Sequence, residues 1–272
     1  MIVIQKFYIF EISGTLAFWL IGSGFSGIGN AFIGYENFIF LKDFTAKNLH
    51  QIIGGLYCCT IASAGGQEFV NFEVEPLLAF SILAFIYPIP LHWFWDEIGW
   101  LQIENSDFTR DFAGAGIVHL TGGCVAFALV LLSKPRPGRF PILGLRNTKW
   151  SRRASNIGLS SINDLHNFAT SLKSGSDATL AGLGAFLNLI GILAFINYEK
   201  DVLFVCFLSM SGGILTSGAL SKIFTKQWSL YRLRGGALIG LVTISSSANQ
   251  LAHYAAFLIG CLAGKLTLIW LN

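Results

Sequence analysis

The chain has few charged residues for its length. Of its 272 residues, 18 are lysine or arginine and 15 are aspartate or glutamate, so that 12% carry a charge. Soluble domains carry about 25%, and a net charge of +3 is too small to indicate a nucleic-acid partner. Hydrophobic residues make up 53% of the chain, and no polar block of domain size interrupts them. These features exclude an ordinary soluble protein and indicate an all-α, polytopic membrane protein.

Cysteines are few and carry no metal-binding pattern. The five cysteines lie in apolar surroundings, and none shows the spacing of metal ligands. The adjacent pair Cys58 and Cys59 is interpreted as helix packing rather than as a redox pair. The sequence also shows no nucleotide-binding motif and no nucleophile paired with a base. We therefore expect no metal, no other cofactor and no enzymatic activity.

Seven or eight apolar segments have about the length, roughly 20 residues, that a helix needs to cross a bilayer. Residues 1–272 are therefore predicted to form one membrane domain. Small residues recur inside these segments and would allow helices to approach closely in lipid. The segment from residue 235 is the shortest and the least typical. The predicted spans are 6–27, 48–66, 76–94, 112–133, 178–197, 202–221, 235–249 and 253–271.

Basic residues are concentrated between the spans, and their positions predict the orientation. A polar loop is predicted at about residues 134–177. Its first part, 134–153, contains seven basic residues and no acid, and a later loop, 222–234, holds four more basic residues. Both loops are expected to be cytoplasmic. The segment 96–107 carries four acids and is expected to be external. Counting back through the spans places the N-terminus in the cytoplasm.

The stretch DFAGAGIVHLTGG, residues 111–123, places an aspartate and a histidine where an apolar span begins. An ionisable group in hydrocarbon is costly and is a candidate for function. If Asp111 and His119 lay on one α-helix, they would differ by roughly 80° of rotation and about 12 Å of rise. Asp111 would then lie at a membrane surface and His119 inside the membrane. The structural alternatives are a helix cap for Asp111 and a packing role for His119.

Several segments resemble the ammonium transporter family, which includes the Amt, Mep and Rh channels. The segment YPIPLHWFWDEIGWL, 87–101, followed ten residues later by DFAGAGIVHLTGG, is similar to two central family signatures at the family's spacing. GTLAFWLIGSGFSGIGNAFIG, 14–34, and RLRGGALIGLVTISSSA, 232–248, resemble further family spans. The similarity is greatest to the eukaryotic Amt branch.

This resemblance implies a fold of eleven transmembrane helices, built from two inverted repeats and assembled as a trimer with one pore in each subunit. The match begins at the family's second helix and stops at its ninth, which implies an incomplete bundle of about eight helices. It further implies ammonium or ammonia as the transported species. We expect an integral protein of the plasma membrane that forms a homotrimer, or a mixed trimer with related subunits.

The resemblance also implies roles for individual residues. Trp95 matches the tryptophan that recruits the cation at the outer mouth of the pore, although it could instead be an ordinary interfacial tryptophan. Asp111 matches the aspartate near that recruitment site. His119 matches the first of two pore histidines, the second of which belongs to a helix beyond the match. Phe195 lies near one phenylalanine of the pore gate, and Gly54 falls where the other is expected.

Two functions stay open. One is an ammonium transporter or channel, and the other is a non-conducting or truncated family subunit that acts in a mixed oligomer. The matches at Trp95, Asp111 and His119 favour the first function, whereas the altered gate and the unmatched helices favour the second.

A pore that transports ammonium must avoid burying an ion in hydrocarbon. Deprotonating ammonium at pH 7 costs only about 3 kcal/mol, because its pKa is about 9.

Overall fold

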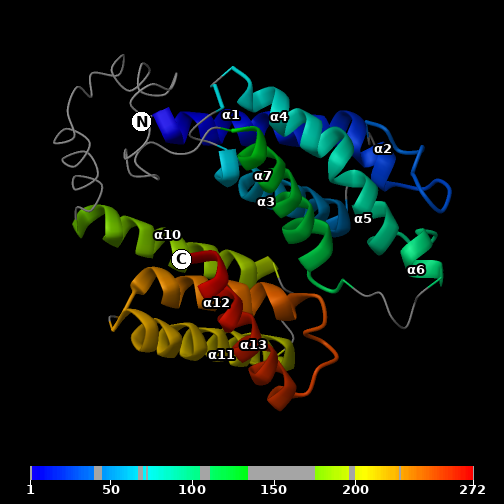
Figure 1. Ribbon diagram of the computed structural model, residues 1–272. Helices are drawn as coiled ribbons and strands as arrows, with labels where there is room; N and C mark the ends of the chain where they lie inside the picture. Colours follow the sequence, from blue (N-terminus) through cyan, green and yellow to red (C-terminus); the bar gives the residue numbers. More distant parts are fainter. Residues whose placement is uncertain are drawn as a thin grey trace, which may run out of the picture. The chain divides into compact units, whose positions relative to one another are not determined.

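In the computed structural model, every regular element among the described residues is a helix, as predicted. The chain divides into two compact units, one of residues 1–132 with 191–272 and one of residues 133–190. Figure 1 shows the helices in chain order. The structure describes residues 2–39, 45–66, 70–71, 73–104, 111–133, 175–195, 200–226 and 228–271.

Three predicted spans are helices that contain a π-helical segment, and the span 48–66 is an unbroken helix. The first comprises α1 (Ile2–Ala17), η1 (Phe18–Gly22) and α2 (Ser23–Ser26). The span 48–66 is α3 (Ala46–Gly66). The next comprises α4 (Glu75–Ser81), η2 (Ile82–Ile86) and α5 (Pro88–Trp95), and the short α6 (Trp100–Glu104) follows it. The last comprises η3 (Ala115–Leu120) and α7 (Thr121–Leu132).

The remaining predicted spans also lie on helices. These are α10 (Gly175–Phe195), α11 (Lys200–Thr225), α12 (Leu230–Ser245) and α13 (His253–Leu271). The predicted span 235–249 is displaced toward the C-terminus relative to α12. Leucine and arginine favour a helix at residues 230–234, whereas the serines and asparagine of residues 246–250 favour the turn observed there. The predicted loop 134–177 overlaps α10 by three residues, and its residues 134–174 lie outside the described part of the chain.

Four helical segments among the described residues are long and apolar enough to cross a membrane. They are Ile9–Ser26, Glu75–Gln102, Ala115–Leu132 and Lys200–Phe224.

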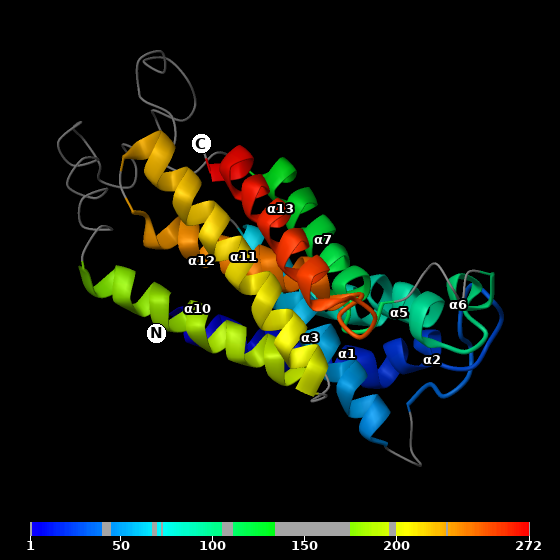
Figure 2. The same cartoon turned by 90° about the horizontal axis from the view of Figure 1, so that it is seen from below.

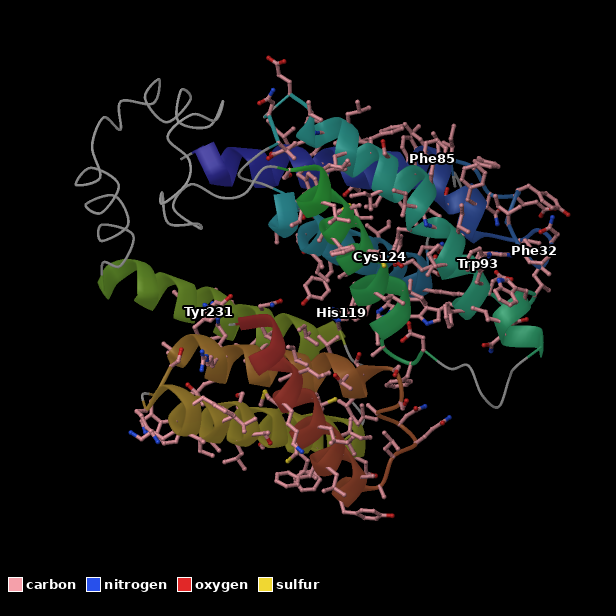
Figure 3. The ribbon with its side chains drawn as sticks, in the orientation of Figure 1. Phe32, Phe85, Trp93, His119, Cys124 and Tyr231 are labelled. Atoms are coloured by element: carbon pink, nitrogen blue, oxygen red, sulfur yellow. The ribbon has the colours of Figure 1, made fainter. Side chains whose placement is uncertain are left out.

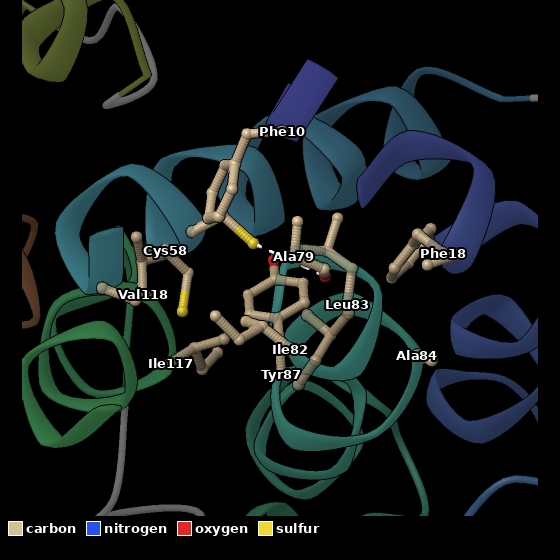
Figure 4. Packing of buried hydrophobic residues seen from close by; sticks show 14 residues of the cluster. Phe10, Phe18, Cys58, Ala79, Ile82, Leu83, Ala84, Tyr87, Ile117 and Val118 are labelled. Atoms are coloured by element: carbon tan, nitrogen blue, oxygen red, sulfur yellow. Dashed lines mark hydrogen bonds between the residues drawn. The ribbon is translucent and has the colours of Figure 1, made fainter. Parts of the chain in front are cut away.

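The core among the N-terminal helices is centred on Tyr87, between η2 and α5. Its side chain is fully buried and packs beside Leu83 and Cys58, as Figure 4 shows. The Tyr87 Oη donates a hydrogen bond to the Gln51 carbonyl oxygen at 2.9 Å, which satisfies the phenol and joins this region to α3. In lipid, packing of this kind stabilises mainly through van der Waals contact. The core therefore holds α3 and α5, which both contribute to the site described below.

Helices α11, α12 and α13 pack against one another (Figure 2), and glycines form close contacts between them. A Cβ atom added at Gly240 would lie only 2.6 Å from the Ser209 carbonyl oxygen. The Ser209 Oγ donates a hydrogen bond to the Gly240 carbonyl oxygen at 2.7 Å. The close approach of α12 to α11 thus requires glycine at this position, in agreement with the packing role predicted for small residues.

Gly240→Ala is expected to destabilise the protein by about 1–3 kcal/mol, because the added methyl group would overpack the contact with Ser209. Denaturation with SDS in mixed micelles measures this change. Gly123→Ala is the matched control, since a Cβ atom there meets nothing within 4 Å. Equal stability of the two variants would contradict the close packing.

Candidate functional site

The carboxylate of Asp111 is buried and accepts three backbone N–H groups. Its Oδ1 accepts the amide of Ala115 at 2.7 Å. Its Oδ2 accepts the amides of Gly116 at 2.8 Å and Ile117 at 2.9 Å. These amides belong to the first turn of η3, where a helix has no acceptors of its own. The structural role predicted for Asp111, that of capping the helix, is therefore observed, and its part in recruiting a cation stays a prediction.

The α-helical geometry that the sequence suggested between Asp111 and His119 is wrong. Residues 111–114 lie before the helix, and Gly114 has a left-handed backbone with φ of 77°. Glycine tolerates this conformation, which most residues avoid. The helix then begins at Ala115 and is π-helical to Leu120. The turn brings the Asp111 carboxylate back over the start of η3 instead of placing it on the helix.

Burial and hydrogen bonding act on Asp111 in opposite directions. Burial raises the pKa of its carboxyl above the usual value, and the backbone N–H donors of η3 oppose that rise by favouring the charged form. Both oxygens are already engaged by amides. The residue can therefore contribute negative potential, while direct binding of an ion would require some of these bonds to break.

Trp95 is fixed by a hydrogen bond to the same residue. Its Nε1 donates to the carbonyl oxygen of Asp111 at 2.6 Å, which joins the end of α5 to the segment before η3. The next residue, Phe112, donates its backbone N–H to the Ser246 carbonyl oxygen at 3.0 Å. The segment before η3 thus holds both the indole of Trp95 and the turn that follows α12.

A cavity of about 400 Å³ lies beside Trp95 and Asp111. It receives side chains from α3, α5, α6, the segment before η3 and the turn after α12. The lining combines aromatic rings with amide, imidazole and charged groups. Its polar and titratable lining residues, together with Trp95, are Lys47, His50, Gln102, Asp111 and Asn249.

His50 connects Trp95 with Phe195. The rings of His50 and Phe195 stack with their centroids 4.1 Å apart and their planes at 12°. The His50 ring centroid is also 5.4 Å from that of Trp95. Sequence reasoning missed His50, although it lies four residues before Gly54 and therefore on the same face of a helix. That spacing was the available clue.

Gly54 is closely surrounded by other side chains. A Cβ atom there would lie 2.8 Å from the Tyr87 Oη, 3.2 Å from the Phe195 Cζ and 3.4 Å from the Val118 Cγ2. A larger side chain at residue 54 would displace these neighbours. Phe195 thus approaches the place where the second gate phenylalanine was expected, and the gate role of Phe195 stays a prediction.

His119 lies apart from the side chains that line the cavity. It projects from η3, one turn before the α7 residue Cys124 (Figure 3), and is half-buried. The Tyr57 ring meets it edge-on, with centroids 5.2 Å apart and planes at 89°. A π-helical segment is frequent at functional sites. The structure therefore brings Trp95, Asp111 and Phe195 together and places His119 separately.

Two further histidines make structural contacts. The buried His92 has its Nε2 2.7 Å from the Asn30 carbonyl oxygen. His253 is exposed at the start of α13, where its ring lies edge-on to Phe204 at 5.0 Å. His166 lies outside the described residues.

The fold and the apolar helices define a polytopic α-helical membrane protein. A model of the Ammonium Transporter Family matches residues 1–272. The chain belongs to this family, which confirms the resemblance found in its motifs.

Relatives and solved structures agree with this membership. The chain is 28% identical to ammonium transporter 1 member 3 of Solanum lycopersicum, over 96% of this chain and 58% of that protein. It is 27% identical to putative ammonium transporter 1 of Caenorhabditis elegans, over 92% of this chain and 46% of that protein. The chain thus spans about half the length of the curated relatives it matches.

The fold is that of the Amt and Mep proteins. The crystal structure of Candida albicans Mep2 aligns with a TM-score of 0.72 and 21% identity, over 95% of this chain and 56% of that one. A structure described as a sensor Amt protein aligns with a TM-score of 0.74 and 23% identity, over 98% of this chain and 65% of that one.

Asp111→Ala is expected to destabilise the protein by about 2 kcal/mol, because the first amides of η3 lose their acceptor. Asp111→Asn should lower the stability less, since the side-chain amide oxygen can still accept a hydrogen bond from η3. Unfolding in mixed micelles measures both. Asp201→Ala, at an exposed aspartate in the first turn of α11, is the control and should cost about 0.5 kcal/mol. A loss for Asp111→Ala no larger than the control's would contradict the cap.

Proposed function

We propose that the chain transports ammonium or ammonia across a membrane through an Amt-type pore. The observation that carries the proposal is that Trp95 and Asp111 line one cavity, with Phe195 stacked on its lining residue His50, in a member of the ammonium transporter family. Relatives named as ammonium transporters support the choice of substrate.

The cavity offers three kinds of attraction for an ammonium ion. The indole face of Trp95 attracts a cation by roughly 0.5–2 kcal/mol. The side-chain oxygens of Gln102 and Asn249, which also line the cavity, can accept N–H donors from the ion. Asp111 adds negative potential while its oxygens remain engaged by η3. Together these groups would replace part of the ion's water shell.

Beyond the cavity, the path proposed for the substrate is apolar and narrow. Phe195 and Val118 approach Gly54 closely, so that a small neutral molecule would pass more easily than an ion with its hydration shell. His119 lies farther along η3. A neutral imidazole can accept a hydrogen bond and relay a proton near neutral pH. We therefore assign Trp95 and Asp111 to recruitment, and Phe195 and His119 to the pore.

The proposed orientation has the N-terminus in the cytoplasm of a plasma-membrane protein. The ends of α11 support it, since Asp201 lies in its first turn and Lys222 in its last. Basic residues favour the cytoplasmic side. A homotrimer is the proposed assembly. Exposed apolar side chains of α7, such as Leu131 and Leu132, would meet lipid or a neighbouring subunit.

The second candidate function is that of a non-conducting subunit in a mixed trimer. The cation Lys47 at the cavity favours it, because a positive charge opposes the recruitment of ammonium. Expression in yeast without its own ammonium transporters separates the two candidates. Methylammonium uptake by the chain alone supports transport. A surface-expressed chain that takes up nothing alone, yet alters uptake by a co-expressed family member, supports the second function.

Trp95→Ala is expected to lower methylammonium uptake about tenfold, through loss of a cation–π contact of roughly 1–2 kcal/mol. Uptake is measured per molecule at the cell surface. Trp93→Ala is the matched control on the same helix. Trp93 donates its Nε1 to the Phe32 carbonyl oxygen at 2.7 Å and is not one of the residues that line the cavity. Equal uptake by the two variants would rule out recruitment by Trp95.

His119→Ala is expected to lower uptake at least about tenfold, because the pore would lose the group that binds and relays the proton. The same uptake assay checks this, with Cys124→Ala as a control at an exposed position of α7. Uptake by His119→Ala at the level of the control would show that this histidine only packs.

A further inference from the structure

A titratable side chain lies among the aromatic rings of the proposed recruitment site. His50 is half-buried and lines the cavity. Its ring stacks on Phe195 at 4.1 Å and lies 5.4 Å from Trp95, measured between centroids. The imidazole therefore contacts both aromatic surfaces that an ammonium ion would use. When protonated, it would itself be a cation on those surfaces.

The charged groups around His50 leave its positive charge poorly compensated. Lys47, one turn earlier on α3, also lines the cavity and adds a second positive charge. Asp111 faces the cavity from the segment before η3, with its oxygens engaged by the amides of that helix. The phenol of Tyr87, close to Gly54, donates to the Gln51 carbonyl oxygen.

The other elements around the cavity contribute uncharged groups among the described residues. Helix α5 contributes Phe94 and Trp95, and α6 contributes Gln102. The turn after α12 contributes Asn249. Phe195, at the end of α10, stacks on His50 without lining the cavity itself. Asp111 is thus the one carboxylate among the cavity's described lining residues, and the backbone of η3 already neutralises part of its field.

We propose that His50 is a proton-operated competitor for the ammonium recruited at this cavity. Neutral His50 accepts a hydrogen bond from the ion through a ring nitrogen. Protonated His50 loses that acceptor and holds its own charge against Trp95 and Phe195, so that it repels the ion at short range in a medium of low dielectric constant. The inference rests on the proposed function, because it concerns the regulation of the same site.

Uptake of methylammonium between pH 8 and pH 4.5 tests the inference in the yeast described above. Methylammonium stays protonated throughout, because alkylammonium groups have a pKa of about 10. Uptake by the natural chain should fall about tenfold for each pH unit below the midpoint of the histidine. His50→Phe keeps the stack on Phe195 but cannot be protonated. Its uptake should therefore change by less than about twofold between pH 8 and pH 4.5. His50→Gln serves if that variant does not reach the surface.

His253→Phe is the matched control for general effects of acid. His253 also packs against a phenylalanine, Phe204, but does not line the cavity. This variant should keep the pH profile of the natural chain. The same acid-induced fall in His50→Phe, or a flat profile in the natural chain, would overturn the inference while leaving transport intact.

Binding separates failure of the inference from failure of the proposed transport. If the surface-expressed chain takes up nothing at any pH, transport by the chain alone is wrong. In that case, calorimetry at pH 8 and pH 5 measures the affinity of the purified chain for methylammonium and tests the role of His50. Binding that weakens at least about tenfold at pH 5, but not in His50→Phe, supports the inference. Equal binding at both pH values, or none at pH 8, overturns it.

Discussion

The hydrogen bonds between the Asp111 carboxylate and the amides of η3 organise the whole site. The buried carboxylate of Asp111 accepts three backbone N–H groups that have no acceptor within the helix. The carbonyl oxygen of the same residue accepts the indole N–H of Trp95. One residue thus fixes both the start of the helix that carries His119 and the ring proposed to attract the substrate. Gly114 makes this possible, because its left-handed backbone forms the turn between the acid and the helix.

The surrounding cavity balances attraction against repulsion. Aromatic faces and side-chain oxygens favour a small cation, whereas Lys47 and the protonated form of His50 oppose it. Phe195 and Val118 approach Gly54 closely, together with the Tyr87 hydroxyl. In the proposed function, the substrate would arrive as an ion and cross as a neutral species. Under the proposal for His50, its protonation would make the entry step respond to pH.

Much of the fold follows from the sequence, because each apolar span of about 20 residues must satisfy its backbone as a helix. The limits of α12 were less predictable, since arginine and leucine extend a helix that composition alone places later. The motifs pointed to Trp95 and Asp111, which line one cavity, whereas Phe195 was predicted only from its approximate position. The turn at Gly114 and the π-helical form of η3 could not be predicted, because they depend on hydrogen bonds made by one side chain. His50 was missed because its role depends on the distant Phe195.

A cryo-electron microscopy structure of the protein in methylammonium tests the central claim most directly. Density for the ion is expected within the cavity, against the face of Trp95, while the Asp111 oxygens remain bonded to the amides of Ala115, Gly116 and Ile117. Density for the ion on the Asp111 carboxylate itself, with those amides released, would contradict it, as would a cavity without the ion at saturating concentration.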